Sequence, residues 1–206
     1  MEFYQVINTR RTVRDFRGGE ISDAVLERIL DAGLKAPSNN HLRQWEFIVI
    51  RDPQRKVETL QYARAFAESG GKELLAKMEQ GSIAYRMYAD AFPKQFAMLN
   101  DASVLLIPFF KAAPAFFQPV AINSYNSLAA VWCCVENILL AAAAEGLACS
   151  LRIPTGDEGP KVSALLNAPE GYVMPCYIGI GYPKEDAGRP EQIQPDVKER
   201  IHIDRW

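Results

Sequence analysis

Four arginines lie within eight residues near the N-terminus, and they are the first candidates for chemistry in this chain. They are Arg10, Arg11, Arg14 and Arg17, with the hydroxyl of Thr12 among them. A guanidinium group presents a planar fork of donors that matches phosphate oxygens. Three such groups and a hydroxyl could neutralise a dianionic phosphate. The alternative interpretation is an ordinary solvated basic face.

The second candidate is the polar loop of residues 38–44, between an amphipathic helix and a strand. Ser38, Asn39, Asn40 and His41 carry hydroxyl, amide and imidazole groups that can hydrogen-bond a flat heterocycle or a polyol chain. The alternative is a capped helix end followed by a core tryptophan, Trp45. The loop alone does not separate the two interpretations.

Several common catalytic patterns are missing from the sequence. There is no G-x-x-x-x-G-K-[ST] loop, no G-x-G-x-x-G between a strand and a helix, no G-x-S-x-G and no H-E-x-x-H. Gly179–Gly181 follows a strand but leads into Tyr182 and Pro183, so it is interpreted as a strand end. The four cysteines show no C-x-x-C spacing, and only His41 and His202 accompany them, which argues against a metal site.

The composition is that of one folded domain. The chain has 206 residues, 49% of them apolar and 23% charged, with a net charge of −2. This balance argues against nucleic-acid binding. The most apolar stretch, Leu128–Ala144, carries Glu136 and Asn137 at its centre, so we expect a buried core helix and no membrane span. Residues 1–13 do not resemble a signal peptide, and with cysteines of the buried, reduced kind they favour a cytoplasmic protein.

Hydrophobic patterns and caps predict about four strands separated by helices. The predicted strands cover residues 46–51, 104–110, 147–153 and 173–180. The predicted helices cover residues 3–10, the stretch from the cap Ser22 to Ala36-Pro37, residues 123–145 and residues 160–166. Between residues 54 and 100 we expect several helices, broken at Gly70-Gly71, Gly81 and Pro93. Residues 111–119 are predicted to form a loop. This order leaves an α+β or a three-layer α/β arrangement open.

Five motifs in order resemble one known family, the nitroreductase-like FMN-dependent oxidoreductases. They are Arg10–Phe16 (R-R-T-V-R-x-F), Ala36–Phe47 (A-P-S ending in W-x-F), Ala144–Leu147, Gly179–Pro183 (G-I-G-Y-P) and Ile201–Trp206 (I-H-x-x-x-W). The resemblance covers the whole chain. It implies an α+β fold, a three-layer nitroreductase-like sheet flanked by helices, in an intertwined homodimer. The single domain, 1–206, would include a helical lid at 61–100 and a C-terminal tail, 184–206, that embraces the partner subunit.

The resemblance also implies FMN as cofactor and assigns its ligands. Arg10, Arg11, Thr12 and Arg14 resemble the ligands of the phosphate and ring edge. The other residues implied to contact the flavin are Pro37, Ser38, Asn39 and His41 from the partner subunit, Gln95 near the flavin, and Pro154, Thr155 and Gly156 along its ring. No side chain needs to act as a nucleophile, so no catalytic residue is assigned.

Some positions depart from the family pattern. His41 and Arg43 replace the usual Asn and Gln, and Gln44 replaces the Pro before the tryptophan. The basic residue expected before the C-terminal motif is displaced, and Arg189 is the nearest substitute for a fourth phosphate ligand.

The resemblance implies a ping-pong reaction in which NAD(P)H delivers hydride to the flavin and a small aromatic or quinone-type acceptor then takes it. The aromatic content of the lid favours flat acceptors, although plain helix packing explains it equally well. Two alternatives remain open: a specialised branch of the family, such as a reductive dehalogenase or a flavin-fragmenting enzyme, and a non-catalytic FMN-binding protein.

Overall fold

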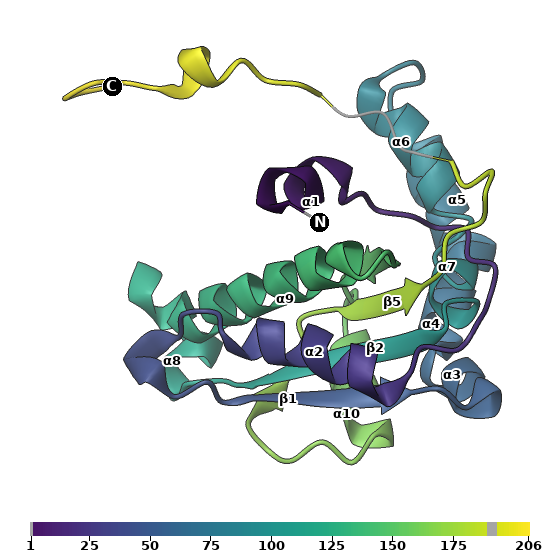
Figure 1. The fold of residues 1–206 in the computed structure, drawn as a ribbon, viewed down its shortest axis with the longest axis horizontal. Helices are drawn as coiled ribbons and strands as arrows, with labels where there is room; N and C mark the ends of the chain where they lie inside the picture. The colour runs from purple at the N-terminus through teal and green to yellow at the C-terminus, as the bar shows by residue number, and fades with distance from the viewer. Residues whose placement is uncertain (1, 189–192) are drawn as a thin grey trace.

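A five-stranded antiparallel sheet organises the computed structural model, which describes residues 2–188 and 193–206 (Figure 1). The strands pair in the order β1-β2-β5-β3, and β4 pairs with β2 beside β5. Their bounds are Trp45–Ile50 (β1), Val104–Lys111 (β2), Ala148–Arg152 (β3), Tyr172–Val173 (β4) and Tyr177–Gly181 (β5). All four predicted strands are therefore confirmed, but the last one is divided into β4 and β5.

Strand β2 shows why the sheet must be covered on both faces, because its first seven residues are all buried. Leu105, Ile107 and Phe109 enter one hydrophobic core, whereas Leu106 and Phe110 enter the other. At the sheet edge, β1 is less buried than its apolar sequence suggests, with Val49 36% exposed.

One face of the sheet is covered by α2 (Asp23–Leu34) and α9 (Asn126–Ala144), and α1 (Phe3–Thr9) lies over α9. Ser22 caps α2 as predicted, its side chain accepting a hydrogen bond from Val25 N. The other face is covered by α3 (Pro53–Thr59), α4 (Gln61–Ala65), α7 (Ala97–Asn100) and α10 (Glu158–Leu165). The arrangement has three layers, as expected.

Helix α9 is buried on one side only. Ile122–Ala144, which contains it, is the one helix of the described chain long and apolar enough to cross a membrane, and 28% of its most apolar window is buried. Val131, Cys134, Val135 and Ile138 pack on the sheet, so this part of α9 is a core helix. The helix begins with a 3₁₀ turn, Ile122–Tyr125, before Asn126.

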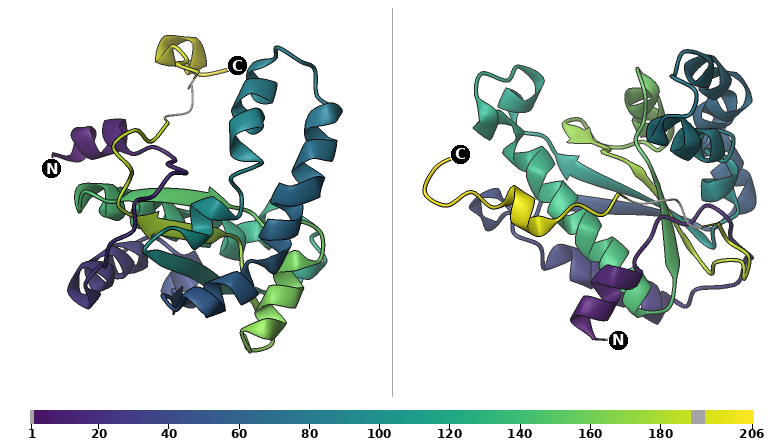
Figure 2. Two further views of the ribbon diagram at one scale, coloured as in Figure 1. Left: turned by 90° about the vertical axis from the view of Figure 1, so that its right-hand side faces the viewer. Right: turned by 90° about the horizontal axis from the view of Figure 1, so that it is seen from above.

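The segment predicted as a lid projects from the sheet as two antiparallel helical arms (Figure 2, left). The first arm continues from α4 through a π-helical turn, Phe66–Gly70, into α5 (Gly71–Ala76), and α6 (Ile83–Ala91) returns. The predicted break at Gly70-Gly71 is therefore wrong. A Cβ on Gly71 would lie 2.8 Å from Phe92 Cβ, so this glycine allows the arms to approach closely.

The loop predicted at 111–119 and the C-terminal tail are the remaining regions of the fold. The predicted loop at 111–119 contains a short helix, α8 (Pro114–Phe117), because Pro114 occupies a first-turn position that needs no backbone N–H. Two short 3₁₀ helices complete the elements, Asn39–His41 and Val197–Arg200. The described part of the C-terminal tail extends away from the sheet (Figure 1), with Trp206 99% exposed.

Candidate functional site

The arginine segment runs as an extended strip beside the sheet. Thr12 forms a parallel bridge with Cys149 of β3, and Val13 N donates to the carbonyl oxygen of Cys149 at 2.9 Å. Farther along, Phe16 forms an antiparallel bridge with Pro183. Backbone pairing at both ends therefore fixes the positions from which the basic side chains project.

Arg10 and Arg11 line a cavity of about 450 Å³ between this strip, the end of α9 and residues 183–187. Lys184 adds a third cationic side chain to its wall, and Glu185 adds an anionic one. Arg10 Nε lies 3.3 Å from Glu136 Oε1, and Arg11 Nη1 donates to the carbonyl oxygen of Arg10 at 2.7 Å. The cavity is thus predominantly cationic, as an anion site requires.

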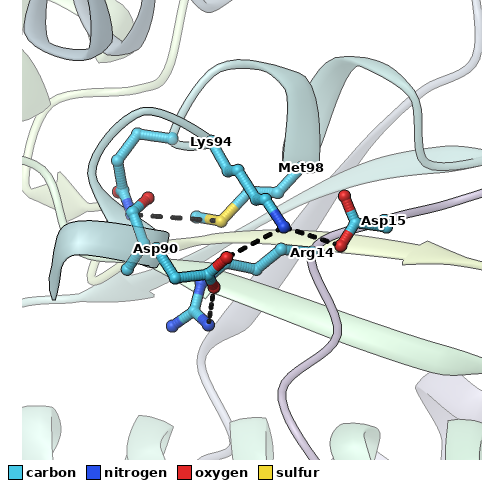
Figure 3. A network of polar contacts seen from close by, with 7 residues as sticks. Arg14, Asp15, Asp90, Lys94 and Met98 are labelled. Carbon is cyan, nitrogen blue, oxygen red and sulfur yellow. Dashed lines mark hydrogen bonds and ion pairs between the residues drawn. The ribbon is translucent and has the colours of Figure 1, made fainter. Parts of the chain in front are cut away.

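Arg14 belongs to a different environment, a network with the lid (Figure 3). Its Nη1 lies 3.4 Å from Asp90 Oδ2, and Lys94 Nζ lies 2.9 Å from Asp90 Oδ1 and 2.8 Å from Asp15 Oδ2. Burial lowers the pKa of Arg14, and the two carboxylates offset part of this effect. Hydrogen bonds to Asp15 and Asp90 raise the pKa of Lys94. Pairing with the two carboxylates therefore favours the charged form of Lys94.

The Nε atom of Arg14 takes no part in this network. Nε is buried and has no hydrogen-bond partner among the described residues. A buried N–H without a partner is costly, so it indicates a site that a bound group completes. Gln95 follows Lys94 directly, and its Nε2 donates to the carbonyl oxygen of Ala91 at 3.1 Å. The predicted place of Gln95 beside the flavin stays a prediction.

The loop after α2 is built on an unusual backbone. Asn40, His41 and Arg43 have φ values of 54°, 57° and 44°, a left-handed region that residues other than glycine rarely adopt. The conformation is held because Ser38 Oγ accepts from Arg43 N at 3.0 Å and Arg43 Nε donates to the carbonyl oxygen of Leu34 at 3.0 Å. Strain of this kind concentrates at functional sites.

This loop lines a second cavity, of about 350 Å³. Ser38 and Asn39 form one side of it, and Trp45, Lys111 and Ser127 lie on the others. The Oγ atom of Ser127 is buried and has no hydrogen-bond partner within residues 2–188 and 193–206. The cavity is therefore apolar with a few polar groups, the usual composition of a small-molecule site.

A buried ionic network supports the loop formed by Pro154, Thr155 and Gly156. Glu158 Oε1 lies 2.5 Å from Arg152 Nη1 and accepts from the Tyr177 hydroxyl at 2.8 Å. Its other oxygen, Oε2, accepts from Thr155 N at 3.0 Å. Burial and the Glu158 carboxylate raise the pKa of Tyr177. The Glu158 carboxylate therefore joins the backbone of this loop to Arg152 and Tyr177.

The network continues into the lid through aromatic contacts. The Arg152 guanidinium lies over the ring of Phe66, 5.6 Å from its centroid. Phe66 makes an edge-to-face contact with Phe92 at 5.3 Å, and Phe92 stacks on Tyr88 at 4.6 Å. Phe66 also opens the π-helical turn, a feature frequent at functional sites.

The predicted residues therefore fall into groups. Arg10, Arg11, Thr12 and Arg14 lie on one strip, and Arg14 contacts Asp90 of the lid, the segment that also carries Gln95. The loop at 154–156 is connected to the lid indirectly, because Arg152 below this loop contacts Phe66. In contrast, Pro37, Ser38, Asn39 and exposed His41 lie at the other end of α2, near α8 (Figure 1). Within one chain, the loop and the arginine segment line separate cavities. Arg189 lies outside the described residues.

Sequence reasoning missed Asp15, Asp90 and Lys94 around Arg14, and Arg152 and Glu158 under the loop. A signal for the second pair was present, because Thr155-x-x-Glu158 matches the S/T-x-x-E pattern of a helix start. No local signal marks the first set, since Asp90 and Lys94 lie more than seventy residues from Arg14.

Comparisons with known proteins agree with this architecture. A provisionally named NADH dehydrogenase/NAD(P)H nitroreductase of Methanothermobacter thermautotrophicus is 28% identical over 100% of this chain and 88% of its own length. An iodotyrosine deiodinase of Nematostella vectensis is 26% identical over 96% of this chain and 73% of its own. The fold superposes with a TM-score of 0.77, at 23% identity and full coverage of both chains, on a crystal structure of oxidized iodotyrosine deiodinase bound to FMN and 3-iodo-L-tyrosine.

The family model matches almost the entire structural unit described above. It covers residues 7–182, from the end of α1 through the arginine segment and the lid to Tyr182 after the last strand. This range includes the whole lining of the 350 Å³ cavity but not residues 183–187 of the 450 Å³ cavity. On this match, the chain belongs to the nitroreductase family.

Proposed function

We propose that this protein is an FMN-dependent oxidoreductase that uses NAD(P)H to reduce nitroaromatic, quinone or related small acceptors by a ping-pong reaction. Membership of the nitroreductase family supports the general activity. The name of the archaeal relative supports a nicotinamide reductant. When bound, FMN supplies the centre that accepts and donates hydride, which explains why the site needs no nucleophilic side chain.

The observation that carries the proposal is the fit of the arginine segment to FMN. Arg10, Arg11 and Lys184 surround a cavity of about 450 Å³, where a terminal dianionic phosphate would be neutralised. Arg14 would offer its buried Nε, which has no hydrogen-bond partner in the described part of the chain, to an electron-rich edge of the ring system. Held there, the guanidinium would stabilise negative charge on that edge.

The loop at 154–156 suits a flat ring. Gly156 adopts φ +55°, and apart from its chain neighbours no described residue has an atom within 4 Å of the position where a Cβ would be. A ring can therefore approach the backbone closely at this point. The lid, residues 61–100, would cover the reductant and the acceptor in turn, and the stacked Tyr88 and Phe92 favour flat aromatic acceptors.

The proposed active unit is a cytoplasmic homodimer. The apolar outer side of α9 and the exposed tail residues Ile201, Ile203 and Trp206 need cover that the described chain does not provide. In a two-fold dimer, Pro37–Asn39 of one protomer would complete the arginine site of its partner, which explains their separate cavities within one chain. We expect deletion of residues 190–206 to weaken dimerisation and FMN binding together. A truncated protein that sediments as a fully FMN-loaded dimer would contradict this role of the tail.

The test of the proposed function is the identity and reactivity of the bound cofactor. The purified protein should release FMN, and no FAD, on denaturation. NADH or NADPH should bleach the flavin absorbance, and a quinone or nitroaromatic acceptor should restore it in stopped-flow measurements. Release of FAD, or a chain that never binds flavin, contradicts the cofactor assignment. A bound FMN that neither nicotinamide reduces contradicts the enzymatic assignment.

Reductive dehalogenation is the second candidate, and one finding favours it. Iodotyrosine deiodinases occur both among the sequence relatives and among the matching structures. The discriminating experiment compares iodide release from 3-iodo-L-tyrosine with reduction of a quinone by the same reduced protein. Iodide release at a rate that exceeds quinone reduction selects the dehalogenase assignment, and the opposite order selects the reductase.

A further inference from the structure

The end of α6 and the turn after it are fastened to the arginine segment by charge. Asp90 accepts from Arg14 at 3.4 Å, while Lys94 lies 2.9 Å from Asp90 and 2.8 Å from Asp15 (Figure 3). Two cations and two anions therefore form a group with no net charge. Of the four side chains, Arg14 is the most buried, at 16% exposed, and Asp90 is the most exposed, at 50%.

This geometry clamps the Arg14 guanidinium on one side. Nη1 is directed to Asp90, and Nε is buried without a partner in the described part of the chain. Because the guanidinium is planar and rigid, fixing one nitrogen restricts the direction in which the other N–H points. Asp90 is in turn held by Lys94, which is anchored on Asp15 of the same strip as Arg14.

We propose that Asp90 and Lys94 are positioning residues that hold Arg14 toward the electron-rich edge of the flavin and set the local charge at that edge. The inference rests on the proposed function, because it takes FMN as the group that Arg14 meets. Both residues belong to the lid segment, so the position of the lid and the affinity for the cofactor are coupled through one arginine. A lid displaced from the strip leaves Arg14 without Asp90.

The charge balance gives the proposal a signature that a purely structural role lacks. Removing the carboxylate of Asp90 leaves a net charge of +1 on the network, and removing the ammonium of Lys94 leaves −1. Positive charge near the flavin favours its reduced, more negative form, and negative charge opposes it. The two substitutions should therefore shift the midpoint potential of bound FMN in opposite directions.

The experiment uses the full chain loaded with FMN, with the variants Asp90→Asn, Lys94→Met and their combination. Glu68→Gln is the matched control, since Glu68 lies in the lid and its carboxylate, 3.5 Å from Arg64, is 70% exposed. We expect Asp90→Asn to raise the potential and Lys94→Met to lower it, whereas the double variant, which restores neutrality, returns close to wild type. Each single substitution should also weaken FMN about threefold to tenfold, because Arg14 loses its orientation.

Potentials that move in the same direction in both single variants, or that move no more than in Glu68→Gln, overturn the proposal. Thermal unfolding of each variant shows whether it is folded, and a folded variant with an unchanged potential counts against the inference. The outcome is separable from the proposed function: wild-type protein without FMN contradicts that function, whereas FMN-loaded variants with unshifted potentials contradict only the positioning role.

Discussion

Glu158→Gln is the substitution with the largest effect that we expect outside the hydrophobic cores. Every partner of this carboxylate is a donor: Arg152 Nη1, the Tyr177 hydroxyl, and the N–H and hydroxyl of Thr155. A glutamine of the same shape replaces one acceptor oxygen by an NH₂ group. This NH₂ group is a donor and cannot accept the hydrogen bonds that the neighbouring donors make to Glu158. It also removes the negative charge that compensates a guanidinium only 3% exposed.

The magnitude follows from the burial of the pair. Both side chains are 3% exposed, so solvent cannot take over the role of the missing charge. Leaving one partner of such a pair uncompensated costs about 3–5 kcal/mol of unfolding free energy. For a chain of 206 residues, this corresponds to a fall in Tm of roughly 6–20 °C.

The assay is urea and thermal unfolding of the wild type, Glu158→Gln, Arg152→Met and the double variant. Exposed Glu170, in the loop after α10, provides the control Glu170→Gln, which should change stability by less than about 0.5 kcal/mol. The double variant should recover part of the loss, because it removes both charges together. A loss below about 1 kcal/mol in Glu158→Gln would refute the view that the carboxylate compensates Arg152.

Three further outcomes are expected. Arg10→Ala and Arg14→Ala should each weaken FMN binding by about 2–4 kcal/mol in a fluorescence titration. Unchanged affinity in both variants would show that the segment is an ordinary solvated basic face. Trp45→Phe should lower unfolding stability by about 1–2 kcal/mol and leave flavin reduction unchanged, because this side chain is buried; a slowed reduction at constant Tm would show the opposite. Burial lowers the pKa of Lys56 below its usual 10.5, so the folded chain loses this proton at a lower pH than the unfolded chain. Wild type should therefore gain stability relative to Lys56→Met as the pH rises toward 10.5, and a constant difference between pH 8 and 10 would contradict this.

The strands and the long helix were predictable because their signals are local. Caps and apolar periodicity placed α2, β2 and α9 to within a few residues. The lid was harder to predict, because Gly70 and Gly71 are usually helix breakers. Here Gly71 serves the close approach of Phe92, a contact set by tertiary packing that no short window of sequence contains.

The candidate site was predictable in its residue types but not in its partners. The arginines, the 38–41 loop and the 154–156 turn came from motif resemblance, and the structure places them on defined supports. The ion pairs of Arg14 depend on how the lid folds back onto the strip, which residue spacing does not encode. For the same reason, the joining of the two cavities across a dimer stays a prediction.

The left-handed backbone at Asn40, His41 and Arg43 has a consequence for laboratory evolution of this protein. Glycine at His41 or Arg43 would relieve the unfavourable conformation, so selection for stability alone would drift toward glycine there. Such drift would also remove the exposed imidazole of the loop and the Arg43 side chain that lines the cavity. A library that holds these two positions fixed and varies Leu42 and Gln44, the two neighbours of Arg43 in the cavity lining, would explore new acceptors on an intact loop conformation.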